Sequence, residues 1–233
     1  MFSFSFFQHP NARWLFDPSN LIYLSVHEHK RFRLLLTSGL LGGPALEKYA
    51  AVQEKVVREH LSAAAAATTA AVDVRIAFRS MAAAASQEVF LGPHVATAEI
   101  ASHLERDILL FTQGFLCFPI PWKWTGSGLS KAIEAAERMT VTVEAMVEPA
   151  RKYVENGGDP RCVLEFFIQS DWQRSTEEGG DPTTHHDIAL GIIDMLFAAQ
   201  DATVSALCFA VDVLDGCEGG REAVNKVSYF LSC

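Results

Sequence analysis

The segment Phe197-Ala-Ala-Gln-Asp-Ala-Thr203 places an amide and a carboxylate side by side inside a long apolar run, from Ile188 to Leu214. Burial of a carboxylate without a partner costs several kcal/mol, so a helix seldom carries one there without a reason. As a helix, the run of about 27 residues is roughly 40 Å long, which suits the middle of a large helical protein. The Gln200–Asp201 pair therefore predicts the point where this helix meets something polar: solvent, a substrate or a cofactor.

Composition limits the class of protein. A chain of 233 residues forms one large domain or two small ones. The net charge of −9 argues against a nucleic-acid partner, because phosphate contacts need clustered Lys and Arg. The five cysteines, at 117, 162, 208, 217 and 233, form no CxxC pair. This spacing favours reduced thiols and supports neither a zinc site nor a redox motif.

The N-terminus and the central run bear on membrane targeting. Residues 1–7 are aromatic, but they lack a basic region and a small-residue cleavage site, so we expect no signal peptide. Asp194 and Asp201 interrupt the central apolar run, so we expect no membrane span.

Apolar periodicity and capping residues predict a mainly α-helical fold. Prolines and aromatic side chains make 118–124 an apolar loop. A strand or extended piece is expected only at Val72 to Phe78, and the Ala/Thr-rich stretch 62–71 either extends the preceding helix or connects it to the next segment. Gln173 to Thr184 reads as a surface loop, with Thr183 or Thr184 capping the central helix. One helix is expected to start at His27. Further helices are expected at 44–60, at 97–115 with Thr97 as N-cap, at 129–156 ended by Gly157-Gly158, and at 159–170.

Four motifs in this order resemble the cytochrome P450 superfamily, the haem-thiolate monooxygenases. Phe197–Thr203 resembles the oxygen-activation segment of the long central helix, and His29-Lys-Arg-Phe-Arg33 resembles a His-x-x-x-Arg of an earlier helix. Two other stretches resemble the sterol-handling branches of this superfamily: residues 86–93, and residues 118–121 followed by 126–132. Phe-Ala-Ala-Gln-Asp-Ala is most similar to the sterol C-22 desaturases, and residues 9–24 agree with that branch.

The resemblance covers about 10–214, with a divergent tail at 215–233. It implies a single partial cytochrome P450 domain over 1–233, with the long central helix and the pair of lid helices. The C-terminal haem-Cys region and most of the β-sheet are not expected in it. A truncated gene model or a spliced reading frame would explain both ends.

The same resemblance assigns the oxygen-activation residues. Asp201 occupies the position of the family's acid, which assists proton delivery to dioxygen through water. The residue after it is Ala202, where many relatives have Thr, and the hydroxyl comes one place later at Thr203. Ala198 and Ala199 are the expected haem-facing residues of this segment. The alternative for Asp201 is a helix carboxylate in an ion pair with a neighbour.

His29 and Arg33 are the expected haem-binding residues on the earlier helix. They are four residues apart and so share one helix face. In the family, such a pair reaches the haem propionates, where Arg offers a fork of charge-assisted donors. The alternative is a solvated basic face, because Lys30 and Arg31 lie beside them.

The loop 118–124 and the pair His185-His186 each have two explanations, one functional and one structural. The loop 118–124 resembles the segment between the lid helices, which meets membrane and substrate; the alternative is packing on its own helices. His185-His186 looks like a metal pair, but neighbours on a helix point apart, so we expect solvent-exposed histidines and no metal other than haem iron.

The axial thiolate of the family is missing from the sequence. A haem-thiolate enzyme needs a Cys in a Phe-x-x-Gly-x-Arg-x-Cys-x-Gly loop after the long helix. Phe111-x-x-Gly-x-x-Cys117 has the wrong spacing and comes before that helix, Cys233 lacks the loop, and Glu222 does not begin a Glu-x-x-Arg. We therefore expect no thiolate-bound haem in this chain alone.

The functional expectation follows from the resemblance. The intact parent would use haem, dioxygen and electrons from a reductase to desaturate a sterol side chain at C-22, on the cytosolic face of the endoplasmic reticulum membrane. We expect no membrane anchor within these 233 residues. The alternative is a non-catalytic helical protein that binds a sterol, another lipophilic molecule or a protein.

Overall fold

A computed structural model describes residues 10–66, 73–122, 125–179 and 181–217. These residues form helices and contain no strand, so the mainly α prediction is confirmed for the described part of the chain. The helices are α1 (Ala12–Leu15), α2 (Val26–Leu41), α3 (Gly43–Ala66), α4 (Val74–Phe90), α5 (Ala98–Gly114), α6 (Gly128–Glu155), α7 (Val163–Glu178) and α8 (His185–Gly216), with 3₁₀ turns at Leu21–Tyr23 and Gly92–His94.

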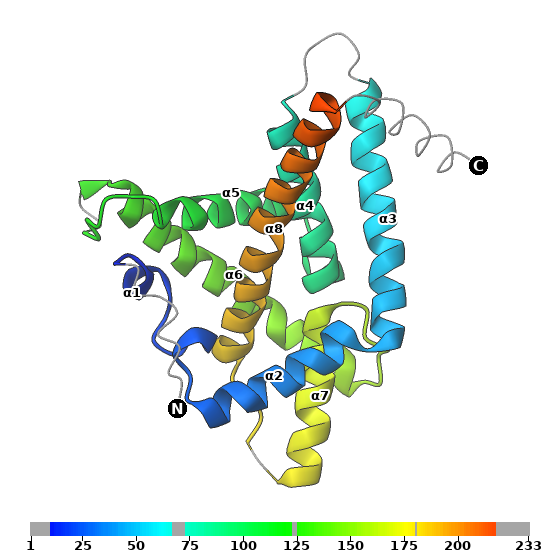
Figure 1. Cartoon of the computed structure of the whole chain (residues 1–233). Helices are drawn as coiled ribbons and strands as arrows, with labels where there is room; N and C mark the ends of the chain where they lie inside the picture. Colours follow the sequence, from blue (N-terminus) through cyan, green and yellow to red (C-terminus); the bar gives the residue numbers. More distant parts are fainter. Residues whose placement is uncertain (1–9, 67–72, 123–124, 180, 218–233) are drawn as a thin grey trace.

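Helix α8 runs through the middle of the molecule (Figure 1). It packs against α4 and α6, while α5 packs on α6, α3 on α4, and α2 on α7. The N-terminal segment with α1 lies against α6. The buried core joins all these helices, with Leu129, Leu164 and Ile188 among its most enclosed side chains.

Local capping explains most of the helix starts. Ser25 forms a capping box with Glu28, and the side chains of Thr97, Ser127 and Thr184 accept backbone N–H bonds at the starts of α5, α6 and α8. These hydroxyls satisfy N–H groups that have no partner within the helix. Thr97 is therefore confirmed as the N-cap of α5, and Thr184 rather than Thr183 is the N-cap of α8.

The strand expected at Val72 to Phe78 is wrong from residue 74 onward, where the chain forms the start of α4. The side chain of Asp73 accepts hydrogen bonds from the N–H groups of Arg75 and Ile76, which makes it the N-cap. This capping outweighs the apolar alternation, and the Ala-rich sequence that follows continues the helix. Val72 lies outside the described residues.

The expected helix 159–170 and the loop 173–184 are both displaced. Helix α7 begins at Val163, because Pro160 disfavours helical backbone before it and Cys162 is extended. It continues through the polar residues to Glu178 and ends at Gly179, whose φ of +71° suits a left-handed C-cap. The surface loop is therefore confined to the residues between α7 and α8.

Other boundaries differ less from the expectation. Helix α3 extends to Ala66, so the Ala-rich sequence lengthens it at least that far, and 67–71 lies outside the described residues. Phe118 and Trp122 in the apolar loop are 77% and 58% exposed. The tail 218–233 also lies outside the described residues.

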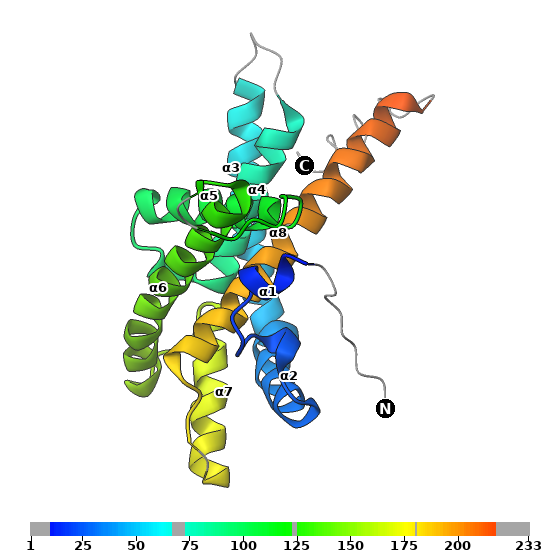
Figure 2. The same cartoon turned by 90° about the vertical axis from the view of Figure 1, so that its left-hand side faces the viewer.

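By length and composition alone, α8 is apolar enough to cross a membrane. Its N-terminal half, however, carries buried side chains such as Ile188, Ile192 and Leu196 that belong to the common core. A core helix passes the same test of composition, so the composition of α8 by itself does not indicate a span. The C-terminal end of α8 projects beyond the other described helices (Figure 2), and Phe209 there is 70% exposed.

Candidate functional site: the central helix and its neighbours

The segment 197–203 lies in the middle of α8, where an aromatic cluster fixes it. The Phe197 ring packs edge-on against Phe111 and stacks on Phe115, with centroids 5.3 and 5.7 Å away, and Phe16 closes the cluster from the N-terminal segment. Such pairs stabilise beyond the area that they bury. Helix α8 is therefore held against α5 at the start of the proposed oxygen-activation segment.

The Gln200–Asp201 pair meets α4 as well as solvent. Gln200 is buried, and its Nε2 donates to Ser86 Oγ over 3.0 Å. Asp201 is half exposed and lies 3.7 Å from the guanidinium of Arg79. The polar environment expected around this pair is thus present, and Ser86 and Arg79 provide part of it. Sequence reasoning did not identify either partner, because both lie far away in the chain.

Asp201 and Thr203 are not brought together. Two residues apart on a regular helix, they point about 200° from one another. Thr203 is exposed, and its Oγ1 donates to the carbonyl of Ala199, 2.6 Å away. Ala198 is exposed and Ala199 partly buried. Helix α8 runs unbroken from His185 to Gly216, through the whole of this segment.

His29 and Arg33 lie one turn apart on α2, and both are exposed. Within the described part of the chain, neither side chain has a hydrogen bond or ion pair. Their neighbour Arg31 is engaged, since it lies 4.0 Å from Asp171 and donates to the carbonyl of Asp181. His29 and Arg33 therefore remain available to bind an anionic group.

These residues fit a haem only in part. Two unengaged donors on α2 suit propionates, and the small exposed side chains Ala198 and Ala202 suit a flat macrocycle. Two of the four described cysteines do not suit the axial position: Cys162 is fully buried, with its pKa raised to about 12 chiefly by burial, and Cys117 Sγ donates to the carbonyl of Gln113. A thiolate ligand needs a lowered pKa.

Cys162 lies beside an ionic cluster in which the buried Glu165 is paired with His94 and with the partly exposed Arg161. Burial would raise the pKa of Glu165, but hydrogen bonds from His94, 2.8 Å away, and from Arg161 lower it to about 2. Three of these side chains could in principle ligate a metal. Because the carboxylate is already satisfied by Arg161 and His94, we interpret the cluster as a structural link between α7 and the turn at Gly92–His94.

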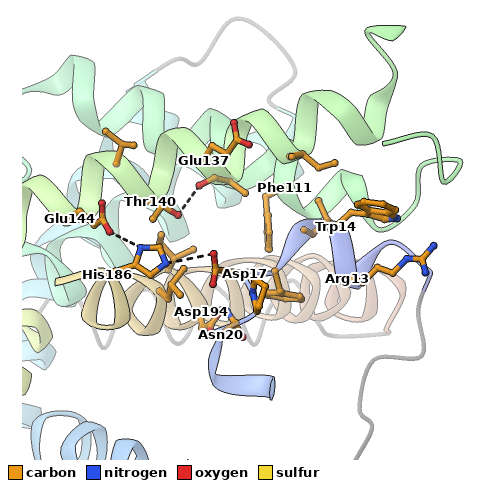
Figure 3. A pocket seen from close by; sticks show the side chains of 18 residues that line it. Arg13, Trp14, Asp17, Asn20, Phe111, Glu137, Thr140, Glu144, His186 and Asp194 are labelled. Atoms are coloured by element: carbon orange, nitrogen blue, oxygen red, sulfur yellow. Dashed lines mark hydrogen bonds and ion pairs between the residues drawn. The ribbon is translucent and has the colours of Figure 1, made fainter. Parts of the chain in front are cut away.

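The His186 side chain is 41% exposed, and it also has two carboxylate partners that the sequence did not predict. Its Nδ1 lies 2.6 Å from Glu144 Oε1 on α6, and its Nε2 lies 3.6 Å from Asp17 (Figure 3). Burial lowers the pKa of His186, but these two carboxylates outweigh that effect and raise it. His186 therefore connects three segments, and it lines a cavity of about 480 Å³.

A second cavity, of about 410 Å³, lies between α2, the start of α8 and the segment before it. Phe32 and Leu35 of α2 line it, together with Leu190 and Gly191 of α8. Neither His29, Arg33, Asp201 nor Thr203 lines either of these two hollows. The expected site residues and the two larger cavities are therefore separate features of the described structure.

The described residues form helices around the long central helix α8, which carries the polar pair Gln200–Asp201. This arrangement places the chain among the large helical domains. The sequence model of the cytochrome P450 family matches residues 3–214, so the chain belongs to this family. A retinoic acid-bound cyanobacterial structure, CYP120A1, superposes with a TM-score of 0.66 at 17% identity, over 88% of this chain and 43% of that one. The partial cytochrome P450 fold is therefore confirmed.

Curated relatives include members of plant and fungal branches. Cytochrome P450 710A2 of Arabidopsis thaliana is 31% identical over 213 residues, which are 89% of this chain and 42% of that protein. C-22 sterol desaturase ERG5 of Candida albicans is 27% identical over 207 residues, or 84% of this chain and 39% of that protein. The chain thus spans less than half the length of these relatives.

Proposed function

We propose that this chain is the central part of a monooxygenase-type oxidoreductase that desaturates a sterol side chain at C-22. The observation that carries the proposal is the family match over 3–214, in which α8 holds Asp201 and Thr203 at its centre. The resemblance of Phe197–Thr203 to the C-22 desaturases, and the similarity to proteins of that name in Candida albicans and Gibberella zeae, support the sterol as substrate.

In this proposal, His29 and Arg33 on α2 would hold the carboxylates of a haem, and Ala198 and Ala199 on α8 would contribute small side chains to its site. Haem, when bound, supplies the dioxygen chemistry. Asp201 holds a proton at its carboxylate and passes it through water, which requires its contact with Arg79 to loosen. Thr203 contributes only if its hydroxyl leaves the carbonyl of Ala199.

The proposed partners are a sterol, a reductase and a membrane surface. Leu116, Phe118 and Trp122 are exposed apolar side chains in and beside the loop after α5. Exposed aromatic side chains of this kind suit the interface of a bilayer. We therefore propose attachment to the endoplasmic reticulum membrane on its cytosolic face, with this loop as one contact.

The test starts with long-read sequencing of the transcript across both ends of the reading frame. The longest frame found is then expressed in yeast that lacks its own C-22 desaturase, and sterols are measured by gas chromatography with mass spectrometry. We expect a 22,23-double bond, and a large loss of it in Asp201→Asn. An unchanged sterol profile from a frame that contains the Cys loop would refute the sterol assignment.

A second candidate, non-catalytic binding of a lipophilic molecule, is favoured by the unsuitable cysteines described above. It predicts saturable binding of a fluorescent sterol to the 233-residue chain in the absence of haem. If the transcript ends at Cys233, this candidate takes precedence, because catalysis then lacks its ligand.

A further inference from the structure

The N-terminal segment, residues 10–24, forms one wall of the hollow of about 480 Å³. Its ends are attached by the amide groups of Asn11, which donates to two backbone carbonyls at the end of α5, and of Asn20, which donates to α8. In its middle, the apolar contacts of the aromatic cluster are accompanied by an ionic contact between Asp17 and His186 of α8. This contact can respond to physiological changes of pH, because histidine titrates in that range.

The ring of His186 has a carboxylate at each nitrogen (Figure 3). Nδ1 lies 2.6 Å from Glu144 Oε1 of α6, and Nε2 lies 3.6 Å from Asp17 Oδ2. A charged imidazolium carries a proton on both nitrogens and attracts both carboxylates, whereas the neutral ring carries only one proton. Because the contact with Glu144 is the shorter, we expect the neutral ring to keep its proton on Nδ1. The lone pair of Nε2 then faces Asp17.

Asp17 is held in its own segment by a second set of bonds. Its Oδ1 accepts hydrogen bonds from the backbone N–H and from the hydroxyl of Ser19, over 2.8 and 2.7 Å. Burial would raise the pKa of Asp17, but these bonds and the charge of His186 lower it, so the carboxylate stays ionised. Repulsion from an unprotonated Nε2 therefore acts on the segment as a whole and not on one side chain alone.

We propose that His186 is a pH-sensitive link that attaches the N-terminal segment to α6 and α8 when its ring is doubly protonated. When Nε2 gives its proton to water, the attraction for Asp17 is lost and the middle of the segment separates from α8 more often. The contact between His186 and Glu144 stays. The link lies outside the segment 197–203, and the inference does not depend on the sterol assignment.

The pH at which the link weakens follows from the charges around the ring. Burial lowers the pKa of His186, but Glu144, Asp17 and Asp187 outweigh this effect and raise it. The link is therefore complete below the ordinary value of 6.5 and is lost as pH rises through a higher value. The other charged groups that line the hollow or adjoin the ring are Arg13 of the N-terminal segment, Glu137 and Glu148 of α6, and His185 and Asp194 of α8, whereas α5 contributes the uncharged Phe111.

Asp194 is a second group that titrates in this range, because burial raises its pKa to about 7. Its Oδ1 accepts the hydrogen bond from Asn20, so its ionisation also affects the N-terminal segment. The variant Asp194→Asn removes this titration and leaves His186 in place. A comparison of this variant with the unaltered chain therefore separates the two effects.

The experiment is hydrogen exchange of the 233-residue chain between pH 5.5 and 8.5, followed by mass spectrometry of peptides from residues 12–20. Each rate is divided by the intrinsic exchange rate at that pH, and a peptide from the buried start of α7 is the internal reference. We expect the protection of 12–20 to fall by about threefold or more as pH rises, which is the size expected for the loss of a partly exposed ion pair. The fall should persist in Asp194→Asn.

The variant His186→Gln has an amide in place of a ring that gains and loses charge. Protection of 12–20 should therefore be low in it at every pH. The matched control is His185→Gln, because the neighbouring histidine is paired with Glu148 of α6, 3.6 Å away. The response to pH should remain in this control.

Asp17→Asn should also abolish the response, since its amide carries no charge, and it decides the question if circular dichroism shows that His186→Gln does not fold. Three outcomes overturn the proposal. They are a protection of 12–20 that does not change with pH, a change that persists in a folded His186 or Asp17 variant, and a change that disappears in Asp194→Asn.

Discussion

At the scale of single residues, Asp194 carries a cost that the fold alone does not require. Its carboxyl group is protonated more readily in the folded chain, with a pKa raised to about 7 by burial. Above the unfolded pKa of 3.8, the unfolded chain ionises first, so the stability contribution of Asp194 declines as pH rises toward 7.

Replacement of Asp194 by Asn should therefore stabilise the chain at alkaline pH. The amide keeps the volume and the bond from Asn20 but removes the buried charge. We expect Asp194→Asn to raise the free energy of unfolding by about 1–4 kcal/mol above pH 8, and to change it little near pH 4. Thermal melts across this pH range measure the difference, with Asp212→Asn as control. A gap that does not grow with pH would contradict the pKa assignment.

The pKa of Glu165 is shifted in the opposite direction from that of Asp194, so its contribution to stability has the opposite pH dependence. Its pKa is lowered to about 2, so its contribution to stability is present above the unfolded value of about 4.5 and is lost as pH falls through 2. Glu165→Gln leaves Arg161 and His94 without their anion, and we expect a loss of about 3–5 kcal/mol at pH 7. Urea unfolding measures it, and Glu177→Gln, exposed on the same helix, should change stability by less than about 0.5 kcal/mol.

At the scale of helices, Gly191 of α8 is the described glycine at which an added Cβ would meet a neighbour at the shortest distance. A Cβ there would lie 2.2 Å from Phe32 Cζ, and the Phe32 ring in turn packs on Phe167 of α7, 5.2 Å away. The absence of a side chain at Gly191 therefore lets α2 fit between α8 and α7. Glycine is normally unfavourable inside a helix, but at position 191 the tertiary packing leaves no room for a side chain.

We expect Gly191→Ala to destabilise the chain by about 1–3 kcal/mol, because Phe32 must leave its position in a packed core. The matched control is Gly216→Ala at the end of the same helix, where a Cβ meets nothing within 4 Å. That change should be neutral or slightly stabilising. Equal effects of the two changes in chemical denaturation would show that Gly191 does not set this contact.

The helices themselves were largely predictable because their signals are local. Ser25 with Glu28, Thr97 and Thr184 stand at helix starts in the sequence as in the structure. The misassigned start of α4 had the same kind of signal in Asp73, which the alternation of apolar residues obscured. The pairing of Asp201 with Arg79, and of His186 with Glu144, could not be predicted, because it depends on how distant helices pack.

At the scale of the whole molecule, the described core closes over the first half of α8 and leaves the second half open. Phe209, Val211 and Val213 are 70%, 40% and 42% exposed. Apolar side chains on one projecting helix end are typical of a surface that another part of a protein covers.

The state of the thiols predicts the spectroscopy of the chain. We expect purified chain mixed with haem and reduced under carbon monoxide to show no thiolate-type difference spectrum, whereas a complete cytochrome P450 treated identically shows one. The physical reason is the state of the thiols: Cys162 is buried with a pKa of about 12, and Cys117 donates its proton to a backbone carbonyl. A thiolate-type spectrum would require another cysteine, and Cys217→Ser, which alters the exposed thiol after α8, would then show whether that residue is the ligand.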